Sequence, residues 1–223
     1  MRFIKAILIP IILVSLTACA LFGGKAPVRS TPESLYQKGQ QYYLKGKYKK
    51  SIEVFQRLRE EYPLSKYTIS AEMGIADSYF STGDYISAES YYNDFVDFHP
   101  TNENLPYVMY QIGLCHYSQM LGIDRDQTET RRARDAFEKL ISRFPSSKFS
   151  FMAEKKLRDT RKRIGEHEFY VGQFYFNRKN YGAALRRFEA VAREYANLGM
   201  DYKVRYFLHE TKKRIAEEKS KTD

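Results

Sequence analysis

The sequence holds few of the residues from which disulfides and metal sites are built. It contains two cysteines, Cys19 and Cys115, and four histidines that are scattered without the spacing of zinc ligands. The histidines are His99, His116, His167 and His209. Cys19 lies in a lipidation motif described below, which leaves Cys115 without a disulfide partner. We therefore predict no metal centre and no disulfide, and we expect Cys115 to be a small buried packing residue.

Motifs of catalytic sites are missing as well. The sequence has neither a glycine-rich loop for phosphate binding nor a nucleophile elbow. The segment Asp124-Arg125-Asp126 lacks the glycine and the distal glutamate that a calcium loop requires. We therefore predict a protein that is not an enzyme and that needs no cofactor.

A long hydrophobic run is also absent. The apolar run at the amino terminus covers residues 7–16, whereas a helix needs about 20 apolar residues to span a bilayer. The run follows Arg2 and Lys5, an order typical of a signal peptide, which we place at residues 1–18. A Leu-Thr-Ala triplet directly before Cys19 resembles the bacterial lipobox, in which cleavage leaves the cysteine as a lipidated amino terminus. The alternative is an ordinary secretory signal with a chance cysteine.

The residues after Cys19 predict where the anchored protein lies. Ala20, rather than aspartate, follows the cysteine, which by resemblance to bacterial lipoproteins favours the outer over the inner membrane. Such lipoproteins carry three acyl chains, and we expect a permanent anchor because one chain alone binds a membrane only marginally. Residues 19–31 contain glycine, proline and small polar residues without a helical period, so we expect a flexible tether there.

The strongest positive signal is a template that four stretches of the chain share. The stretches begin at Pro32, Ile69, Pro106 and Gly165, with eight residues inserted in the third, and each is numbered from place 1. Place 8 holds a small residue and place 24 a large aromatic one in every stretch. Those at place 8 are Gly39, Ala76, Gly113 and Gly172, and those at place 24 are Phe55, Tyr92, Phe137 and Phe188. Small residues let two helices approach closely and large ones fill the seam, the pattern of the tetratricopeptide repeat (TPR).

The template predicts an all-α fold, a right-handed TPR solenoid of about ten helices in five pairs. The solenoid covers residues 32–219 and leaves a tail at residues 220–223. The expected helices lie at roughly 33–46, 48–62, 67–82, 85–98, 104–121, 129–144, 148–163, 165–178, 181–195 and 201–219. Gly165 is the expected break between the seventh and eighth helices, although residues 148–178 could also form one long bent helix.

Charge is spread unevenly along the chain. Residues 19–128 hold 11 basic and 13 acidic residues, a net charge of −2. Residues 129–223 hold 24 basic and 14 acidic residues, a net charge of +10. A solvated helical surface explains most single lysines, but the excess on one half suggests a partner. An acidic protein domain or an anionic membrane surface fits this partner better than nucleic acid, because the predicted location is outside the cytoplasm.

The repeats also predict a binding surface. By resemblance to other TPR proteins, the first helix of each pair lines the concave face, and places 2, 5, 9 and 12 point into it. Place 5 holds Tyr36, Met73, Tyr110 and Phe169, and place 12 holds Tyr43, Phe80, Tyr117 and Phe176. Because the two places are seven residues apart, they share one helix face. These side chains form either the core between pairs or an apolar floor that binds an extended, aromatic-rich peptide.

Two segments narrow the resemblance to one family. The first is Tyr107-Val108-Met109-Tyr110 and the second is Asp124-Arg125-Asp126. Together with Tyr-Pro-Leu-Ser-Lys-Tyr at residues 62–67 and the lipobox, they resemble the BamD family, also called ComL or YfiO-like. Members of this family are TPR lipoproteins of the outer-membrane β-barrel assembly machine. The resemblance extends from Cys19 to about Ala196.

The resemblance implies an outer-membrane lipoprotein that faces the periplasm and catalyses no reaction. Its carboxy-terminal pairs would bind the periplasmic domains of the barrel-forming subunit BamA, and other assembly subunits would join the complex. Its amino-terminal groove would recognise carboxy-terminal targeting segments of unfolded outer-membrane proteins. Arg187 and Arg193 are candidates for the docking surface. Tyr107 matches the family motif, and we expect an ion pair between Asp124 and Arg125 to hold the inserted loop.

Two other functions fit the same fold. A pilotin-like or cell-envelope scaffold lipoprotein, for secretin or pilus assembly or for division, would share the repeats and the anchor. By resemblance, such proteins lack the Tyr-Val-Met-Tyr and Asp-Arg-Asp segments. A peptidoglycan-active enzyme carrying TPRs would need a further catalytic domain, for which ten helices leave no room.

Overall fold

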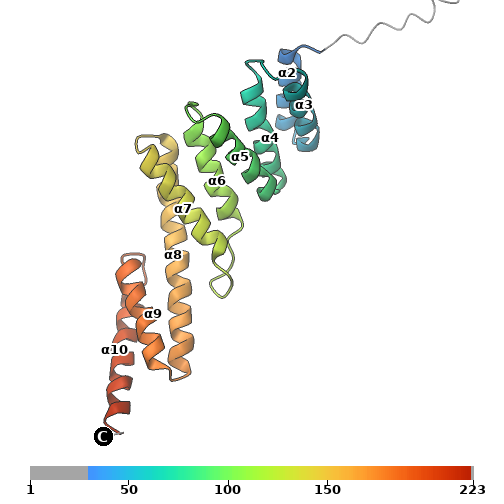
Figure 1. The fold of residues 1–223 in the computed structure, drawn as a ribbon. Coiled ribbons are helices and arrows are strands. Elements are labelled where there is room, and N and C mark those ends of the chain that lie inside the picture. The colour runs from blue at the N-terminus through green and yellow to red at the C-terminus, as the bar shows by residue number, and fades with distance from the viewer. Residues whose placement is uncertain (1–29, 222–223) are drawn as a thin grey trace, which may run out of the picture.

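The computed structural model describes residues 30–221, and this part of the chain folds into nine α-helices without a strand. The helices are α2 (Pro32–Leu44), α3 (Tyr48–Glu61), α4 (Thr68–Thr82), α5 (Tyr85–Phe98), α6 (Leu105–Ser118), α7 (Thr128–Arg143), α8 (Lys148–Asn177), α9 (Tyr181–Glu194) and α10 (Asp201–Lys219). Figure 1 shows an elongated stack with α2 and α10 at opposite ends. The all-α TPR-like fold is therefore confirmed.

Contacts between helices run mainly from neighbour to neighbour along the chain. Each helix packs against the next one, and α2 also contacts α4 while α6 also contacts α8. This is the arrangement of a solenoid, in which each repeat meets only its neighbours. The core is accordingly divided into several clusters between successive helices rather than gathered in one place.

Glycines of the template lie where aromatic rings cross the seam between helices. An added Cβ on Gly39 of α2 would stand 2.5 Å from the ring of Phe55 on α3. Gly74 of α4 meets the other side of the same ring, also at 2.5 Å. Phe55 is 2% exposed, so the two glycines let a large side chain fill the space between three helices. The pairing of place 8 with place 24 is thus confirmed as a packing rule.

Helix starts follow the capping signals of the sequence. Thr31 caps α2 through a 3.2 Å hydrogen bond from the Ser34 amide to its hydroxyl, and Pro32 occupies the first turn. Asp84 caps α5 in the same way by accepting from the Ser87 amide. The turn before α5 contains Gly83, whose φ of 80° is a left-handed conformation that favours glycine.

The expected break at Gly165 is wrong. Residues 148–163 and 165–178, predicted as two helices, form the single 30-residue helix α8, which reduces ten expected helices to nine in the described chain. An added Cβ on Gly165 would stand 2.6 Å from Met200 Cε and 2.9 Å from Tyr195 Cβ. The glycine therefore permits close approach of the segment before α10. This packing outweighs the loss of about 1 kcal/mol that glycine costs in a helix interior.

Helix α8 takes part in two successive pairs. Its first half supplies Ala153 to a cluster with Phe137 of α7. Its second half supplies Phe169 to a cluster with Phe188 of α9 and Val204 of α10. Residues 165–178 therefore pair with α9, as the template register predicts, whereas residues 148–163 and 165–178 cannot pair with each other because they lie on one continuous helix.

Cys115 is a packing residue, as predicted. Its side chain is fully buried in a cluster with residues of α4 and α5. Burial raises the pKa of its thiol to about 12, so the reactive thiolate is not formed at neutral pH.

Several predictions concern residues outside the described part. The signal peptide at 1–18, the lipidated Cys19, most of the tether at 19–31 and the last two residues of the tail are among them. Within residues 30–221, no helix combines the length and hydrophobicity that crossing a membrane requires.

Candidate functional site

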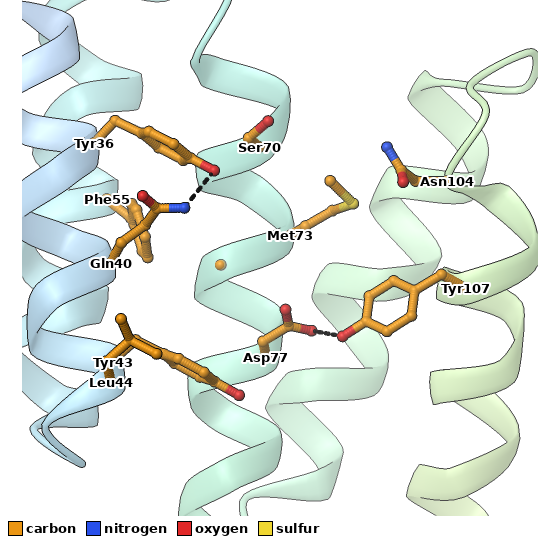
Figure 2. A pocket seen from close by; sticks show the side chains of 11 residues that line it. Tyr36, Gln40, Tyr43, Leu44, Phe55, Ser70, Met73, Asp77, Asn104 and Tyr107 are labelled. Carbon is orange, nitrogen blue, oxygen red and sulfur yellow. Dashed lines mark hydrogen bonds between the residues drawn. The ribbon is translucent and has the colours of Figure 1, made fainter.

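The amino-terminal pairs line a cavity of about 390 Å³, open on one side, between α2, α4 and the start of α6. It is lined by Tyr36, Gln40, Tyr43, Leu44, Phe55, Ser70, Met73, Gly74, Asp77, Asn104 and Tyr107. Figure 2 shows the side chains of α2 on one side of this space, Met73 and Asp77 on α4, and Tyr107 opposite. We call it the amino-terminal cavity.

Helix α2 presents three polar or aromatic side chains to the cavity at spacings of four and three residues. Tyr36, Gln40 and Tyr43 therefore share one helix face. The Tyr36 ring stacks on Tyr67 at 5.2 Å between centroids, and its hydroxyl accepts a 2.9 Å hydrogen bond from Gln40 Nε2. The Tyr43 hydroxyl lies 3.1 Å from Ser81 Oγ on α4. These contacts hold both rings in place before any ligand arrives.

Helix α4 forms one wall of the amino-terminal cavity and supplies its charged residue, Asp77. Gly74 leaves room for the Phe55 ring, which lines the cavity from behind. One turn further along, Asp77 Oδ1 accepts two hydrogen bonds of 2.6 Å, from the hydroxyls of Tyr92 and Tyr107. Burial raises the pKa of Asp77, and the two tyrosine hydroxyls oppose part of that rise. Tyr107 is oriented in turn, since its hydroxyl accepts from Gln111 Nε2 at 2.8 Å.

The two predicted aromatic rows divide between cavity and core. Tyr36, Tyr43 and Met73 line the cavity. Tyr110 and Phe169 are 7% and 8% exposed and belong to the core between pairs. Core packing is therefore observed for Tyr110 and Phe169, and the peptide-binding floor stays a prediction for the three residues that line the cavity.

The remaining members of the rows are half-buried between helices. Phe80 packs edge-on against Tyr85, and Phe176 packs edge-on against Phe207. Tyr117 donates to Asp159 Oδ2 at 3.2 Å and carries the Lys156 ammonium 4.0 Å from its ring centroid. These side chains do not line the amino-terminal cavity.

The inserted loop between α6 and α7 is held by a residue that the sequence did not single out. Gln127 is 1% exposed, and its amide nitrogen donates to the carbonyl oxygens of Gly122 at 2.7 Å and Arg125 at 3.0 Å. The expected ion pair between Asp124 and Arg125 is not among the ion pairs of residues 30–221, where both side chains are exposed. The buried Gln127 amide, rather than an ion pair between Asp124 and Arg125, thus holds this loop from inside.

Helix α8 closes the loop from outside. Arg163 Nη1 donates to the Leu121 carbonyl at 2.8 Å, and His167 Nδ1 lies 2.7 Å from the Ile123 carbonyl. Asp126 accepts from the Thr128 amide at 2.8 Å, and hydrogen bonds from Thr128 lower the pKa of its carboxyl group.

The two arginines predicted for docking lie on different surfaces of α9. Arg187 forms an ion pair with Glu168 of α8, which also lies 3.6 Å from Arg131. Arg193 pairs with Glu194 at 2.7 Å, and its side chain is 71% exposed. It lines a hollow of about 510 Å³ together with Arg134, Glu138, Arg161, Glu194 and Tyr195. Arg187 instead lines a separate hollow with Tyr175 and Arg186.

The sequence contained a signal for the cavity residues that were missed. Gln40 stands at place 9 of the first stretch, and Ser70 and Asp77 stand at places 2 and 9 of the second. Both places point to the concave face, yet only the large apolar residues at places 5 and 12 were singled out.

In residues 30–221 no group of three or more histidine, cysteine, aspartate or glutamate side chains could hold a metal ion.

Comparison with known proteins places the chain in a family. The model of the outer membrane lipoprotein family YfiO matches residues 29–223. The chain belongs to this family. The family description agrees with the predicted outer-membrane lipoprotein and with the resemblance to BamD.

Three relatives of this YfiO-family chain are named outer membrane protein assembly factor BamD. The protein of Rickettsia prowazekii (strain Madrid E) is 32% identical over 73% of this chain and 64% of its own length. That of Vibrio cholerae is 25% identical over 74% of this chain and 72% of its own length. That of Neisseria meningitidis (strain MC58) is 25% identical over 86% of this chain and 78% of its own length. Each is named as an assembly factor rather than as an enzyme.

Among solved structures, the TPR2AB domain of yeast Sti1 in a pHSP90 complex has a TM-score of 0.48 at 14% identity. That match covers 82% of this chain and 70% of that one. A kinesin-light-chain TPR-like protein of Podospora has the same TM-score at 11% identity. That match covers 84% of this chain and 98% of the other.

Proposed function

We propose that this protein is a non-catalytic lipoprotein subunit of the complex that assembles β-barrel proteins in the outer membrane. Its amino-terminal cavity would receive extended segments of unfolded outer-membrane proteins. The observation that carries the proposal is the cavity of ordered aromatic side chains on the face of the repeats. The relatives named assembly factor BamD support the same function.

The dimensions of the cavity suit part of a chain rather than a folded domain. A volume of about 390 Å³ accommodates one or two side chains, at the lower end of the usual range for ligand pockets. Because Tyr36 and Tyr43 are already held by Gln40, Tyr67 and Ser81, little side-chain freedom is lost when a peptide binds. Tyrosine offers a flat apolar face with a polar rim, which suits segments of varied sequence.

The carboxy-terminal pairs would dock the barrel-forming subunit. A BamA-like protein would present an acidic periplasmic domain to the basic surface around Arg193. There Arg134 and Arg161 line the same hollow, which also holds Glu138 and Glu194. Arg187 would act on a second surface, where Glu168 holds its guanidinium group. The net charge of +10 on residues 129–223 supports an acidic protein partner over nucleic acid for a protein outside the cytoplasm.

The membrane anchor is part of the same proposal. Residues 1–18 would be removed as a signal peptide, and Cys19 would carry the lipid that holds the protein on the periplasmic face of the outer membrane. The lipobox triplet before Cys19 supports this assignment. Replacement of Cys19 by alanine is expected to move the protein from the membrane to the periplasmic fraction, and retention in the membrane would contradict it.

Purification from native membranes tests the assembly function directly. A carboxy-terminally tagged form is extracted in mild detergent, and the co-eluting proteins are identified by mass spectrometry. A BamA-like barrel protein in stoichiometric amount is the expected result, reduced by Arg193→Glu. A secretin, pilus component or division protein in its place would move the function to the envelope-scaffold alternative while the fold stands.

A further inference from the structure

The amino-terminal cavity has a charge as well as a shape. Among its lining residues, all of which lie in the described part of the chain, Asp77 is the only charged one. The others are aromatic, aliphatic or neutral polar. A site with one carboxylate and no base attracts cations and repels anions.

The carboxylate of Asp77 has one oxygen held by the protein and one open to solvent, since no buried side-chain oxygen of residues 30–221 lacks a partner. Both of its hydrogen bonds, from Tyr92 and Tyr107, reach Oδ1 at 2.6 Å. No hydrogen bond between residues 30–221 reaches Oδ2, and Figure 2 shows this oxygen on the side of Asp77 away from Tyr107. A ligand group that donates to Oδ2 would therefore replace water there and form a charge-assisted hydrogen bond.

The walls around the carboxylate are suited to a flat cation. Tyr36 and Tyr43 extend from α2 toward α4 in Figure 2, and Tyr107 lies opposite. Aromatic faces attract guanidinium and ammonium groups through the ring quadrupole, and arginine more often than lysine makes such contacts. The planar fork of arginine can also donate two hydrogen bonds to one carboxylate.

We propose that the amino-terminal cavity binds a basic side chain, preferably arginine, of an extended peptide, and that Asp77 determines this specificity. The inference rests on the proposed function and refines it. A peptide's terminal carboxylate would meet the Asp77 carboxylate if it entered the cavity, so it stays outside. The recognised residue is therefore an internal arginine flanked by apolar residues. The cavity would bind the targeting segment at this internal residue and not at its carboxy-terminal end.

The test uses three synthetic octapeptides that differ at one central position. They carry arginine, citrulline or glutamate among the same apolar neighbours, and all have acetylated and amidated ends. Citrulline has the shape of arginine without its charge, so the comparison isolates the cation. Affinity for the full chain without its signal peptide is measured by fluorescence anisotropy at about 0.15 M salt. At this salt concentration, interactions between exposed charges more than about 8 Å apart are largely screened.

Two variants complete the design. Asp77→Asn keeps an oxygen that accepts from Tyr92 and Tyr107 but removes the charge, and Asp94→Asn removes an exposed charge on α5 as a matched control. We expect the wild type and Asp94→Asn to bind the arginine peptide roughly tenfold more tightly than the citrulline peptide, the size of one charge-assisted hydrogen bond. The glutamate peptide should bind most weakly. With Asp77→Asn the arginine and citrulline peptides should bind equally.

Each result decides a different question. Equal binding of arginine and citrulline peptides by the wild type, or a preference that survives in Asp77→Asn, would overturn the specificity while leaving peptide recognition intact. Absence of binding by all three peptides would remove peptide recognition from the proposed function, and this proposal with it. Circular dichroism and thermal unfolding of Asp77→Asn establish that a lost preference reflects the missing charge rather than unfolding.

Discussion

The two ends of the array use the same template positions for opposite purposes. At the amino-terminal end, places 5 and 12 hold Tyr36, Tyr43 and Met73 around a cavity. At the carboxy-terminal end, the equivalent Phe169 and Phe176 pack against Phe207 of α10, both at 5.4 Å between ring centroids. One face of a repeat thus lines a cavity or forms a core according to what the next helix brings.

A single pair of residues explains much of this difference. Phe188 and Phe55 both stand at place 24, and each is contacted by the following first helix. Against Phe188 that helix presents Phe207, with 5.2 Å between centroids. Against Phe55 it presents Gly74, which has no side chain. The Phe55 ring itself occupies the space beside Gly74, and because glycine brings no ring equivalent to Phe207, Phe55 and Gly74 both line the amino-terminal cavity.

The largest expected effect comes from truncating Phe169, the buried aromatic residue at the carboxy-terminal end. Phe169→Ala should lower the free energy of unfolding by about 3 to 5 kcal/mol, because a nearly buried ring leaves a void among Phe188, Phe207 and their neighbours. Urea denaturation followed by circular dichroism measures it. Phe174→Ala, at a ring 47% exposed on the same helix, serves as the control and should cost far less. Equal losses would mean that Phe169 is not core.

The corresponding change at the cavity should affect binding instead. Tyr43→Ala together with Met73→Ala should weaken peptide binding by about 2 kcal/mol, roughly thirtyfold, because both line the site. Helicity should be unchanged. Tyr117→Ala is the matched control, since Tyr117 does not line the cavity. A loss of affinity in Tyr117→Ala of the same size would show that the binding surface extends beyond the second pair.

The glycine that opens the cavity can be tested by itself. Gly74→Ala places a Cβ 2.5 Å from Phe55 Cε2, and the resulting overpacking should cost about 1 to 3 kcal/mol of stability. Gly182→Ala is the control, because an added Cβ there meets no atom within 4 Å. Thermal unfolding of both variants provides the comparison, and a Gly74→Ala protein as stable as wild type would show that Phe55 can shift freely.

The smallest expected effect concerns pH. Burial raises the pKa of Asp77, so the folded protein holds this proton more tightly than the unfolded chain. Its contribution to stability therefore falls as the pH rises from the unfolded pKa of about 4 to the raised folded value, and it stays low at neutral pH. Asp77→Asn should be more stable than wild type at pH 7, by about 1 kcal/mol, the usual size of one stabilising change. Near pH 4 the difference should shrink. Urea denaturation at both pH values measures the difference in free energy of unfolding between the two proteins. A difference that stays constant or changes in the opposite direction would contradict the prediction.

The repeats were predictable because their packing depends on local spacing. Gly39 and Phe55 are sixteen residues apart in one helical hairpin, and sequence alone relates them through the template. The same reasoning failed at Gly165, because the reason for a glycine there is the approach of Met200 and Tyr195 from a later segment. Helix propensity argued for a break, while tertiary packing required only a small side chain.

The candidate site was predictable in part for a similar reason. Tyr36, Tyr43 and Met73 were identified because helical periodicity fixes which face a side chain occupies. Asp77 was not, since its importance depends on Tyr107, thirty residues away on α6. Periodicity also could not separate cavity from core, because Phe207 closes the space at one end and nothing in the template specifies that residue.

Helix α8 has a mechanical consequence for the array. An unbroken helix of 30 residues is about 45 Å long and bends little over that length. Since it is shared by two successive pairs, the carboxy-terminal pair cannot hinge against the centre without breaking backbone hydrogen bonds. A partner docked at that end, as proposed above, would therefore be held at a fixed distance and angle from the middle of the molecule. On that proposal, this part of the protein would act as a rigid spacer.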